Sequence, residues 1–156
     1  MTNRKNLHDY GLALISLAVL HLFIFITSVV SGFIDGTISE ALATVDPEIL
    51  VAVKVMLCIF GVIIAIIVCA DAFIGIQALK VSANPTADKW HINLAKVFFV
   101  LSAIAVVFAI LSFFDSGVSS FNAILNLVNA ILSVGVYFLF IKAASAVRND
   151  ALNATK

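Results

Sequence analysis

The sequence predicts an all-α integral membrane protein, a four-helix bundle that runs up-down-up-down with both termini in the cytoplasm. Of its 156 residues, 63% are hydrophobic and only 12% are charged, whereas soluble domains are about 45–50% apolar and about 25% charged. The apolar excess falls in four long runs, and the basic residues cluster in three of the five polar segments around those runs. We therefore expect residues 1–156 to form a single transmembrane domain.

Each apolar run is long enough to cross a bilayer, which takes about 20 helical residues. The first helix is expected at about 10–34, a stretch without Asp, Glu, Lys or Arg. The apolar part of a cleaved signal peptide spans only about 7–15 residues, so we expect this run to be retained. The second helix is expected at about 47–81, because Asp46 can cap its N-terminus and Pro47 suits the first helical position.

The third and fourth helices are expected at about 86–114 and 119–148. Asn84 and Pro85 precede the third helix in the same cap-then-proline pattern that precedes the second. The polar tail after the fourth helix is expected to fray. The outer loop 35–46 has apolar residues at helical spacing, which indicates a short amphipathic helix on the outer surface.

The charge distribution predicts the orientation of these helices. All Lys and Arg residues except Lys54 lie at the N-terminus, in the 80–96 segment or near the C-terminus, whereas the other two connections contain acids and no basic residue. Basic segments tend to stay in the cytoplasm. We expect the first two helices to form one hairpin and the last two another. The short loops favour the plasma or inner membrane of a prokaryotic cell.

Two ionisable residues are expected at similar depth in the inner half of the membrane. At 1.5 Å per residue, His21 lies about 15 Å and Asp71 about 12 Å from the cytoplasmic ends of their helices. Ionisable groups at membrane depth are costly, so they indicate a function or a specific partner. One hypothesis is a pair that handles protons or cations. The other, which we favour, is a hydrogen bond that joins two helices. His8 and His91 are expected to be solvated at the inner interface.

Lys54 lies near the outer end of the second run. Its long stem can reach the lipid headgroups, and the alternative is that it attracts anions at an outer vestibule. Small residues recur along the same run, and we expect Lys54 and Asp71 to lie on this small-residue face, turned toward neighbouring helices. The face comprises Cys58, Gly61, Ala65, Val68, Ala72 and Gly75.

A polar stripe follows the fourth run. Its members, at i, i+4, i+7 and i+11, cover an arc of under about 60° on a helix. Exposing these polar side chains to lipid would be costly. The stripe should therefore point into the bundle, into a water-filled cleft or toward another subunit. Interhelical hydrogen bonding and a polar pore or substrate cleft are both open interpretations. The stripe consists of Asn122, Asn126, Asn129 and Ser133.

No motif in the sequence indicates a reaction. It has no Ser-His-Asp arrangement, Gly-rich phosphate loop or Cys/His cluster, so we expect no enzyme activity, no cofactor and no metal. The net charge is zero, which gives no bulk attraction to nucleic acid. The expected partners are the lipid bilayer and either other membrane-protein subunits or further copies of this chain.

Two classes of function remain. The favoured one is a small polytopic membrane protein that acts as a non-catalytic subunit, regulator or assembly partner, because polar pairs in helix bundles more often join helices than form pathways. The alternative is a small homo-oligomeric channel or transporter. The candidate intramembrane polar site of that alternative comprises His21, Asp71, Lys54, Asn122, Asn126 and Asn129.

Overall fold

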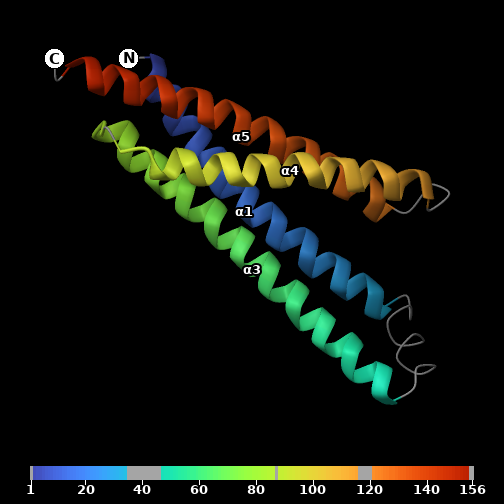
Figure 1. Cartoon of the computed structure of the whole chain (residues 1–156). Coiled ribbons are helices and arrows are strands. Elements are labelled where there is room, and N and C mark those ends of the chain that lie inside the picture. The colour runs from blue at the N-terminus through green and yellow to red at the C-terminus, as the bar shows by residue number, and fades with distance from the viewer. Residues whose placement is uncertain (1, 35–46, 87, 116–120, 155–156) are drawn as a thin grey trace.

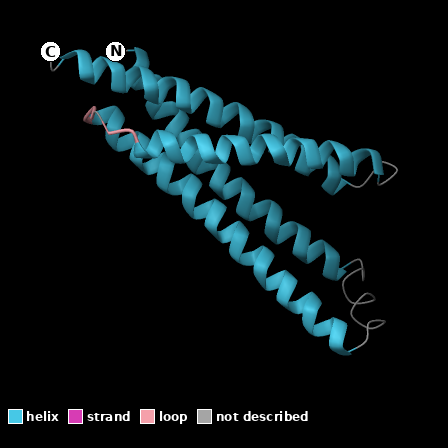
Figure 2. Ribbon diagram, in the orientation of Figure 1, coloured by secondary structure: helices cyan, strands magenta, loops and turns pink. Residues whose placement is uncertain are grey.

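The computed structural model describes the whole chain except residues 1, 35–46, 87, 116–120 and 155–156. The described residues form helices and no strand (Figures 1 and 2). Every helix contains a segment long and apolar enough to cross a membrane, so the predicted all-α fold with four helices of membrane-spanning length is confirmed. The helices are α1 (Thr2–Ile34), α3 (Pro47–Ala83), α4 (Trp90–Asp115) and α5 (Phe121–Ala154).

The start of α4 differs from the prediction. This helix begins at Trp90 rather than near residue 86, because the cap is Asp88, whose Oδ1 accepts a hydrogen bond from the Trp90 backbone N–H at 3.2 Å. Asn84, the expected cap, instead belongs to the end of α3, where its N–H donates to the Lys80 carbonyl at 2.9 Å. The outer loop 35–46, with its expected surface helix, and the expected start of the fourth helix at 119 lie outside the described residues.

The two terminal helices are longer than predicted. Helix α1 already begins at Thr2, and α5 continues to Ala154 instead of fraying after residue 148. The extensions contact each other, since the Asn3 side-chain amide donates to Asp150 Oδ2 at 3.1 Å. Leu7 is fully buried. The polar ends therefore prolong the bundle beyond the apolar runs.

The four helices form two hairpins. Consecutive helices run in opposite directions, and both termini lie at the same end of the molecule (Figure 1). Helix α1 packs along α3, and α4 packs along α5, as predicted. Contacts between α1 and α5 join the hairpins, whereas α3 and α4 touch only slightly. The hairpins lie together at the end that carries the termini and diverge toward the other end (Figure 1).

This divergence divides the bundle into a closed half and an open half. Fully buried side chains such as Leu14, Ile74 and Phe140 lie in the closed half, whereas Ile24 and Ala130 are the buried apolar side chains of the described open half. The closed half comprises residues 2–20, 68–83, 90–100 and 131–154, and the open half comprises residues 21–30, 50–67, 101–111 and 123–130.

Two glycines bring α1 and α3 into close contact in the closed half. A Cβ atom on Gly75 would lie 2.7 Å from the Gly11 carbonyl oxygen and 2.7 Å from Ile15 Cγ1. A Cβ atom on Gly11 would lie 2.8 Å from Ala78 Cβ. Because neither position has room for a side chain, the glycines set the short distance between these helices.

Candidate functional site

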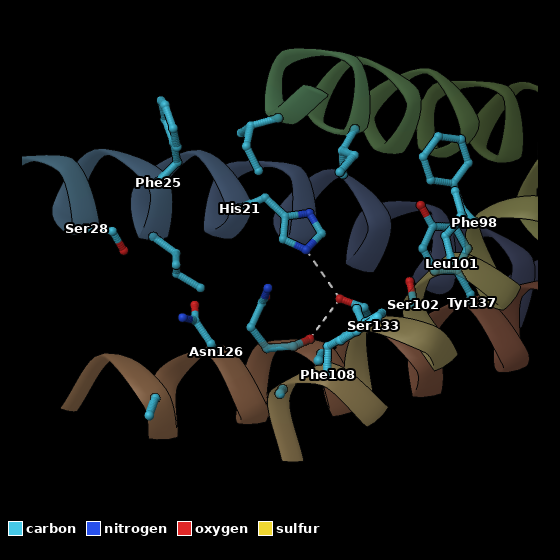
Figure 3. A pocket seen from close by; sticks show the side chains of 18 residues that line it. His21, Phe25, Ser28, Phe98, Leu101, Ser102, Phe108, Asn126, Ser133 and Tyr137 are labelled. Carbon is cyan, nitrogen blue, oxygen red and sulfur yellow. Dashed lines mark hydrogen bonds between the residues drawn. The ribbon is translucent and has the colours of Figure 1, made fainter. Parts of the chain in front are cut away.

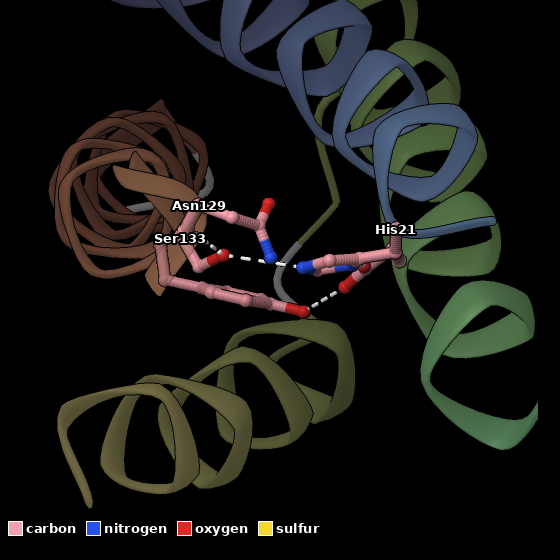
Figure 4. A network of polar contacts seen from close by, with 5 residues as sticks. His21, Asn129 and Ser133 are labelled. Atoms are coloured by element: carbon pink, nitrogen blue, oxygen red, sulfur yellow. Dashed lines mark hydrogen bonds and ion pairs between the residues drawn. The ribbon is translucent and has the colours of Figure 1, made fainter. Parts of the chain in front are cut away.

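A chain of polar contacts joins the two hairpins where the closed half meets the open half. His21 Nδ1 on α1 lies 2.7 Å from Asp71 Oδ2 on α3, and the Tyr137 hydroxyl on α5 donates to Asp71 Oδ1. On the other side of the imidazole, His21 Nε2 lies 3.3 Å from Ser133 Oγ (Figure 4). We call these four residues the polar network. It links α1 and α3 to α5.

Asp71 lies at the centre of this network and has no exposed surface. A carboxyl group away from water is tolerated only when its oxygens are paired, and here each oxygen has a protein partner. Tyr137 is 1% exposed, and its ring stacks on Phe98 of α4 with centroids 6.1 Å apart. All four helices therefore hold the network in place.

A hydrogen bond from Ser133 connects the polar network to Asn129, one turn earlier on α5. The Ser133 hydroxyl donates to the Asn129 backbone carbonyl at 2.8 Å, a bond back to the preceding turn that serines in helices often form. Asn129 Oδ1 is buried and has no hydrogen-bond partner among the described residues. The side-chain oxygen of Asn129 thus remains available to accept a further hydrogen bond.

A cavity of about 490 Å³ lies next to the network (Figure 3). All four helices line it, and aromatic and aliphatic side chains such as Phe25, Ile64, Leu101 and Phe108 form much of the wall. Asp71 does not line the cavity, because His21 and Tyr137 lie between its carboxyl group and the cavity. The polar residues of the lining are His21, Ser28, Ser102, Asn126, Asn129, Ser133 and Tyr137.

The structure brings together some of the residues in the predicted polar site and leaves others apart. His21 and Asp71 are in direct contact, and Asn126 and Asn129 both line the cavity. Asn122 lies in α5, but its side chain is outside the described part of the chain. Lys54 is exposed and does not line the cavity.

The expectation that Lys54 and Asp71 share a face of α3 is wrong. Lys54 is exposed, whereas Asp71 is buried. Their separation of 17 residues corresponds to roughly 4.7 turns of a 3.6-residue helix, which places the side chains about 100° apart. The expected small-residue face is packed unevenly: Cys58 and Ala65 are exposed, Gly61, Val68 and Ala72 are partly buried, and Gly75 is buried at the contact with α1.

Two further residues differ from expectation. His91, expected to be solvated, is only 2% exposed. Its ring packs edge-on against Phe140 of α5 with centroids 6.3 Å apart, because it lies on the face of α4 that is turned toward the bundle, next to the buried Ile92. Tyr137 was absent from the predicted site. Its position four residues after Ser133 continues the polar stripe of α5, and this spacing was the signal that could have revealed it.

Known proteins give no further indication of what this site does. No protein-family model, no curated protein and no solved structure matches the chain. Among the residues that the structure describes, no group of three or more His, Cys, Asp or Glu side chains is placed to hold a metal ion.

Proposed function

We propose that this protein is a non-catalytic component of a membrane complex, a subunit, regulator or assembly partner whose two hairpins dock other transmembrane helices. We place it in the plasma or inner membrane of a prokaryotic cell, with both termini and the 80–96 segment in the cytoplasm. The charge distribution supports this orientation.

One observation carries the proposal. The intramembrane acid Asp71 has no exposed surface and is paired through both oxygens with protein groups. A carboxyl group that binds a transported ion or relays protons needs access to a water-filled path, whereas a carboxyl group that joins helices needs partners on other helices. The geometry of Asp71 fits the second role.

The alternative is a homo-oligomeric channel or transporter. Its support is the cavity, which all four helices line and toward which Asn126 and Asn129 lie. A single copy encloses this cavity only in part, because the hairpins diverge (Figure 1). A transport pathway would therefore need further copies to complete its wall.

Cross-linking in the native membrane tests the proposed docking role. The two thiols, Cys58 and Cys69, are both exposed, and they lie in the open and closed halves respectively. Cys69→Ser leaves a single site for a benzophenone maleimide in the open half, and Cys58→Ser leaves one in the closed half. We expect a defined adduct with one partner subunit at a fixed stoichiometry, confirmed by native mass spectrometry. A protein that remains monomeric and gives no adduct from either site contradicts the proposal.

A flux assay separates the two classes. Purified wild type, Asp71→Asn and the control Lys54→Gln are each reconstituted into liposomes that contain a pH-sensitive dye. An ion gradient is then applied across the liposome membrane. The proposal expects flux equal to that of protein-free liposomes in all three. Flux in the wild type and in Lys54→Gln that Asp71→Asn abolishes would establish the transporter alternative instead.

A further inference from the structure

The proton positions of the polar network follow from its hydrogen bonds. Ser133 has one hydroxyl proton, which it donates to the Asn129 carbonyl at 2.8 Å. The Ser133 oxygen can then only accept in its 3.3 Å contact with His21 Nε2. His21 Nε2 must therefore carry a proton and act as the donor.

The charge of the His21–Asp71 pair leads to the same assignment. One proton lies between His21 Nδ1 and Asp71 Oδ2, which are 2.7 Å apart. Whether this proton rests on the ring or on the carboxyl group, the pair is neutral overall when Nε2 is also protonated. Without the Nε2 proton the pair would carry a net negative charge in an apolar bundle, which is costly. Two independent arguments thus make Nε2–H a donor.

This donor is weakly used within the protein. The distance of 3.3 Å to Ser133 Oγ exceeds the usual 2.7–3.2 Å of an N–H···O bond, and Ser133 keeps its own bond to Asn129 if that contact is lost. His21 and Ser133 both line the cavity (Figure 3). A ligand in the cavity can therefore accept a hydrogen bond from His21 Nε2–H at little cost to the network.

The rest of the cavity limits the ligand to a neutral, largely apolar molecule. Its volume of about 490 Å³ lies within the range of about 300–1,000 Å³ for small-molecule sites. The described lining includes no Lys or Arg to balance an anion and no acid to balance a cation. Its walls are mainly apolar, and the amides of Asn126 and Asn129 lie on the same side as the His21 donor, since Asn129 is four residues before Ser133.

We infer that this cavity binds a neutral lipophilic molecule through a carbonyl oxygen, which accepts a hydrogen bond from His21 Nε2 while the apolar body packs against Phe25, Leu101 and Phe108. Two membrane sources supply this chemistry, a quinone and a fatty acyl ester. The site goes beyond the proposed docking role and does not depend on it, because a component that docks other helices needs no ligand.

Binding of three probes to the purified full-length protein in maltoside detergent tests the inference. Decylubiquinone offers ring carbonyls, methyl laurate offers an ester carbonyl, and dodecylbenzene has a similar apolar body without a carbonyl. Isothermal titration gives the Kd of each probe. We expect at least one carbonyl probe to bind about tenfold more tightly than dodecylbenzene, as one hydrogen bond provides. Equal affinities for all three probes would overturn the proposal.

Two substitutions of His21 distinguish the role of Nδ1, which contacts Asp71, from the role of Nε2, which would bind the ligand. The side-chain amide of His21→Asn can occupy the position of Nδ1 and keep the bond to Asp71, but it has no group at the position of Nε2. The amide of His21→Gln reaches the position of Nε2 but not that of Nδ1. We expect His21→Asn to weaken carbonyl-probe binding about tenfold, whereas His21→Gln retains more of it. A carbonyl affinity unaffected by His21→Asn would refute the role of Nε2.

A matched pair on α4 tests the location of the site independently of the network. Ala105 lines the cavity, and Ala105→Phe should block it and reduce the affinity for the carbonyl probes at least tenfold. Val107 is exposed and outside the lining, so Val107→Phe should bind as the wild type does. Equal binding by both variants would show that the probes bind elsewhere and overturn the proposal.

The preference between the two carbonyl probes identifies the source of the ligand. A shift of the His21 Nε2–H resonance in ¹⁵N-histidine-labelled protein should accompany binding, with His8→Gln as an assignment control because His8 is exposed near the N-terminus. A shift with decylubiquinone alone assigns a quinone, and a shift with methyl laurate alone assigns an acyl lipid. No shift with either probe would contradict the assigned hydrogen bond, whatever the outcome of the docking experiments.

Discussion

The closed half and the open half contain the same kinds of apolar side chains but pack very differently. In the closed half, Leu14 and Ile74 are among many buried apolar side chains, whereas the buried apolar side chains of the described open half are Ile24 and Ala130. Lipid tails are as apolar as leucine, so apolar side chains gain little by leaving lipid for another helix. Hydrophobicity therefore does not decide which half of this bundle closes.

Two features distinguish the closed half. The glycine contact between α1 and α3 lies within it, and the polar network forms its boundary. Close backbone approach and interhelical hydrogen bonds are the interactions that hold helices together in a bilayer. If these features close the bundle, removing them should loosen it, whereas changes in the open half should not. The free energy of unfolding, measured by SDS titration with far-UV circular dichroism, reports this loosening.

The largest effect is expected for Asp71→Leu. This change leaves His21 and Tyr137 without their shared partner inside the bundle, and we expect the free energy of unfolding to fall by roughly 3–5 kcal/mol. Asp9→Leu, at an exposed acid of α1, should have little effect. An Asp71→Leu protein as stable as the wild type would mean that the network does not join the hairpins.

The next largest effect is expected for Gly75→Ala. The added Cβ would lie 2.7 Å from the Gly11 carbonyl oxygen, so α1 and α3 must separate, at a cost of about 1–3 kcal/mol. Gly135→Ala is the matched control, since nothing lies within 4 Å of its added Cβ and alanine favours a helix by up to about 1 kcal/mol. If both variants behave alike, the close contact is not what closes this half.

A smaller effect is expected for Tyr137→Phe. The ring and its stacking on Phe98 remain, but Asp71 Oδ1 loses its donor, which should lower the free energy of unfolding by about 1–2 kcal/mol. Tyr10→Phe provides a control at a half-buried tyrosine of α1. A loss as large as that of Asp71→Leu would show that the hydroxyl, rather than the carboxyl group, organises the network.

The smallest effect is expected in the open half. Asn126 is exposed along the cavity, so Asn126→Leu should change the free energy of unfolding of the isolated protein by less than about 0.5 kcal/mol. Leucine would also suit a lipid-facing position. A clear destabilisation of the isolated protein would indicate that a helix of a second copy covers the open half, and the division into two halves would then apply only to the single chain.

Much of this fold could be predicted from the sequence, because membrane-length apolar runs have few alternatives. The charge distribution predicts the direction of each helix. From these directions, His21 and Asp71 are expected at similar depth, which agrees with their contact in the structure. The start of α4 could not be predicted in the same way. Asn84 and Asp88 are both good caps, and the choice between them depends on how α3 ends.

The divergence of the hairpins and the full network could not be predicted either. An apolar sequence does not reveal which of its faces meets lipid and which meets another helix, so the exposure of Cys58 on the small-residue face was unexpected. Tyr137 was overlooked because tyrosine in an apolar run reads as an ordinary large side chain. Its spacing after Ser133 continues the polar stripe, but the stripe does not identify Asp71 as the partner of its hydroxyl.

The contact between Gly11 and Gly75 also has a mechanical consequence. It lies near the C-terminal end of α3, so most of the helix, from Gly75 back to Pro47, extends to one side of the contact and would move if α3 rotated about the glycines. That part of α3 measures roughly 42 Å at 1.5 Å per residue, and a rotation of about 10° at the glycines would carry its far end about 7 Å. A displacement too small to disturb the glycine contact would thus be magnified several-fold at the far end of α3, in the open half.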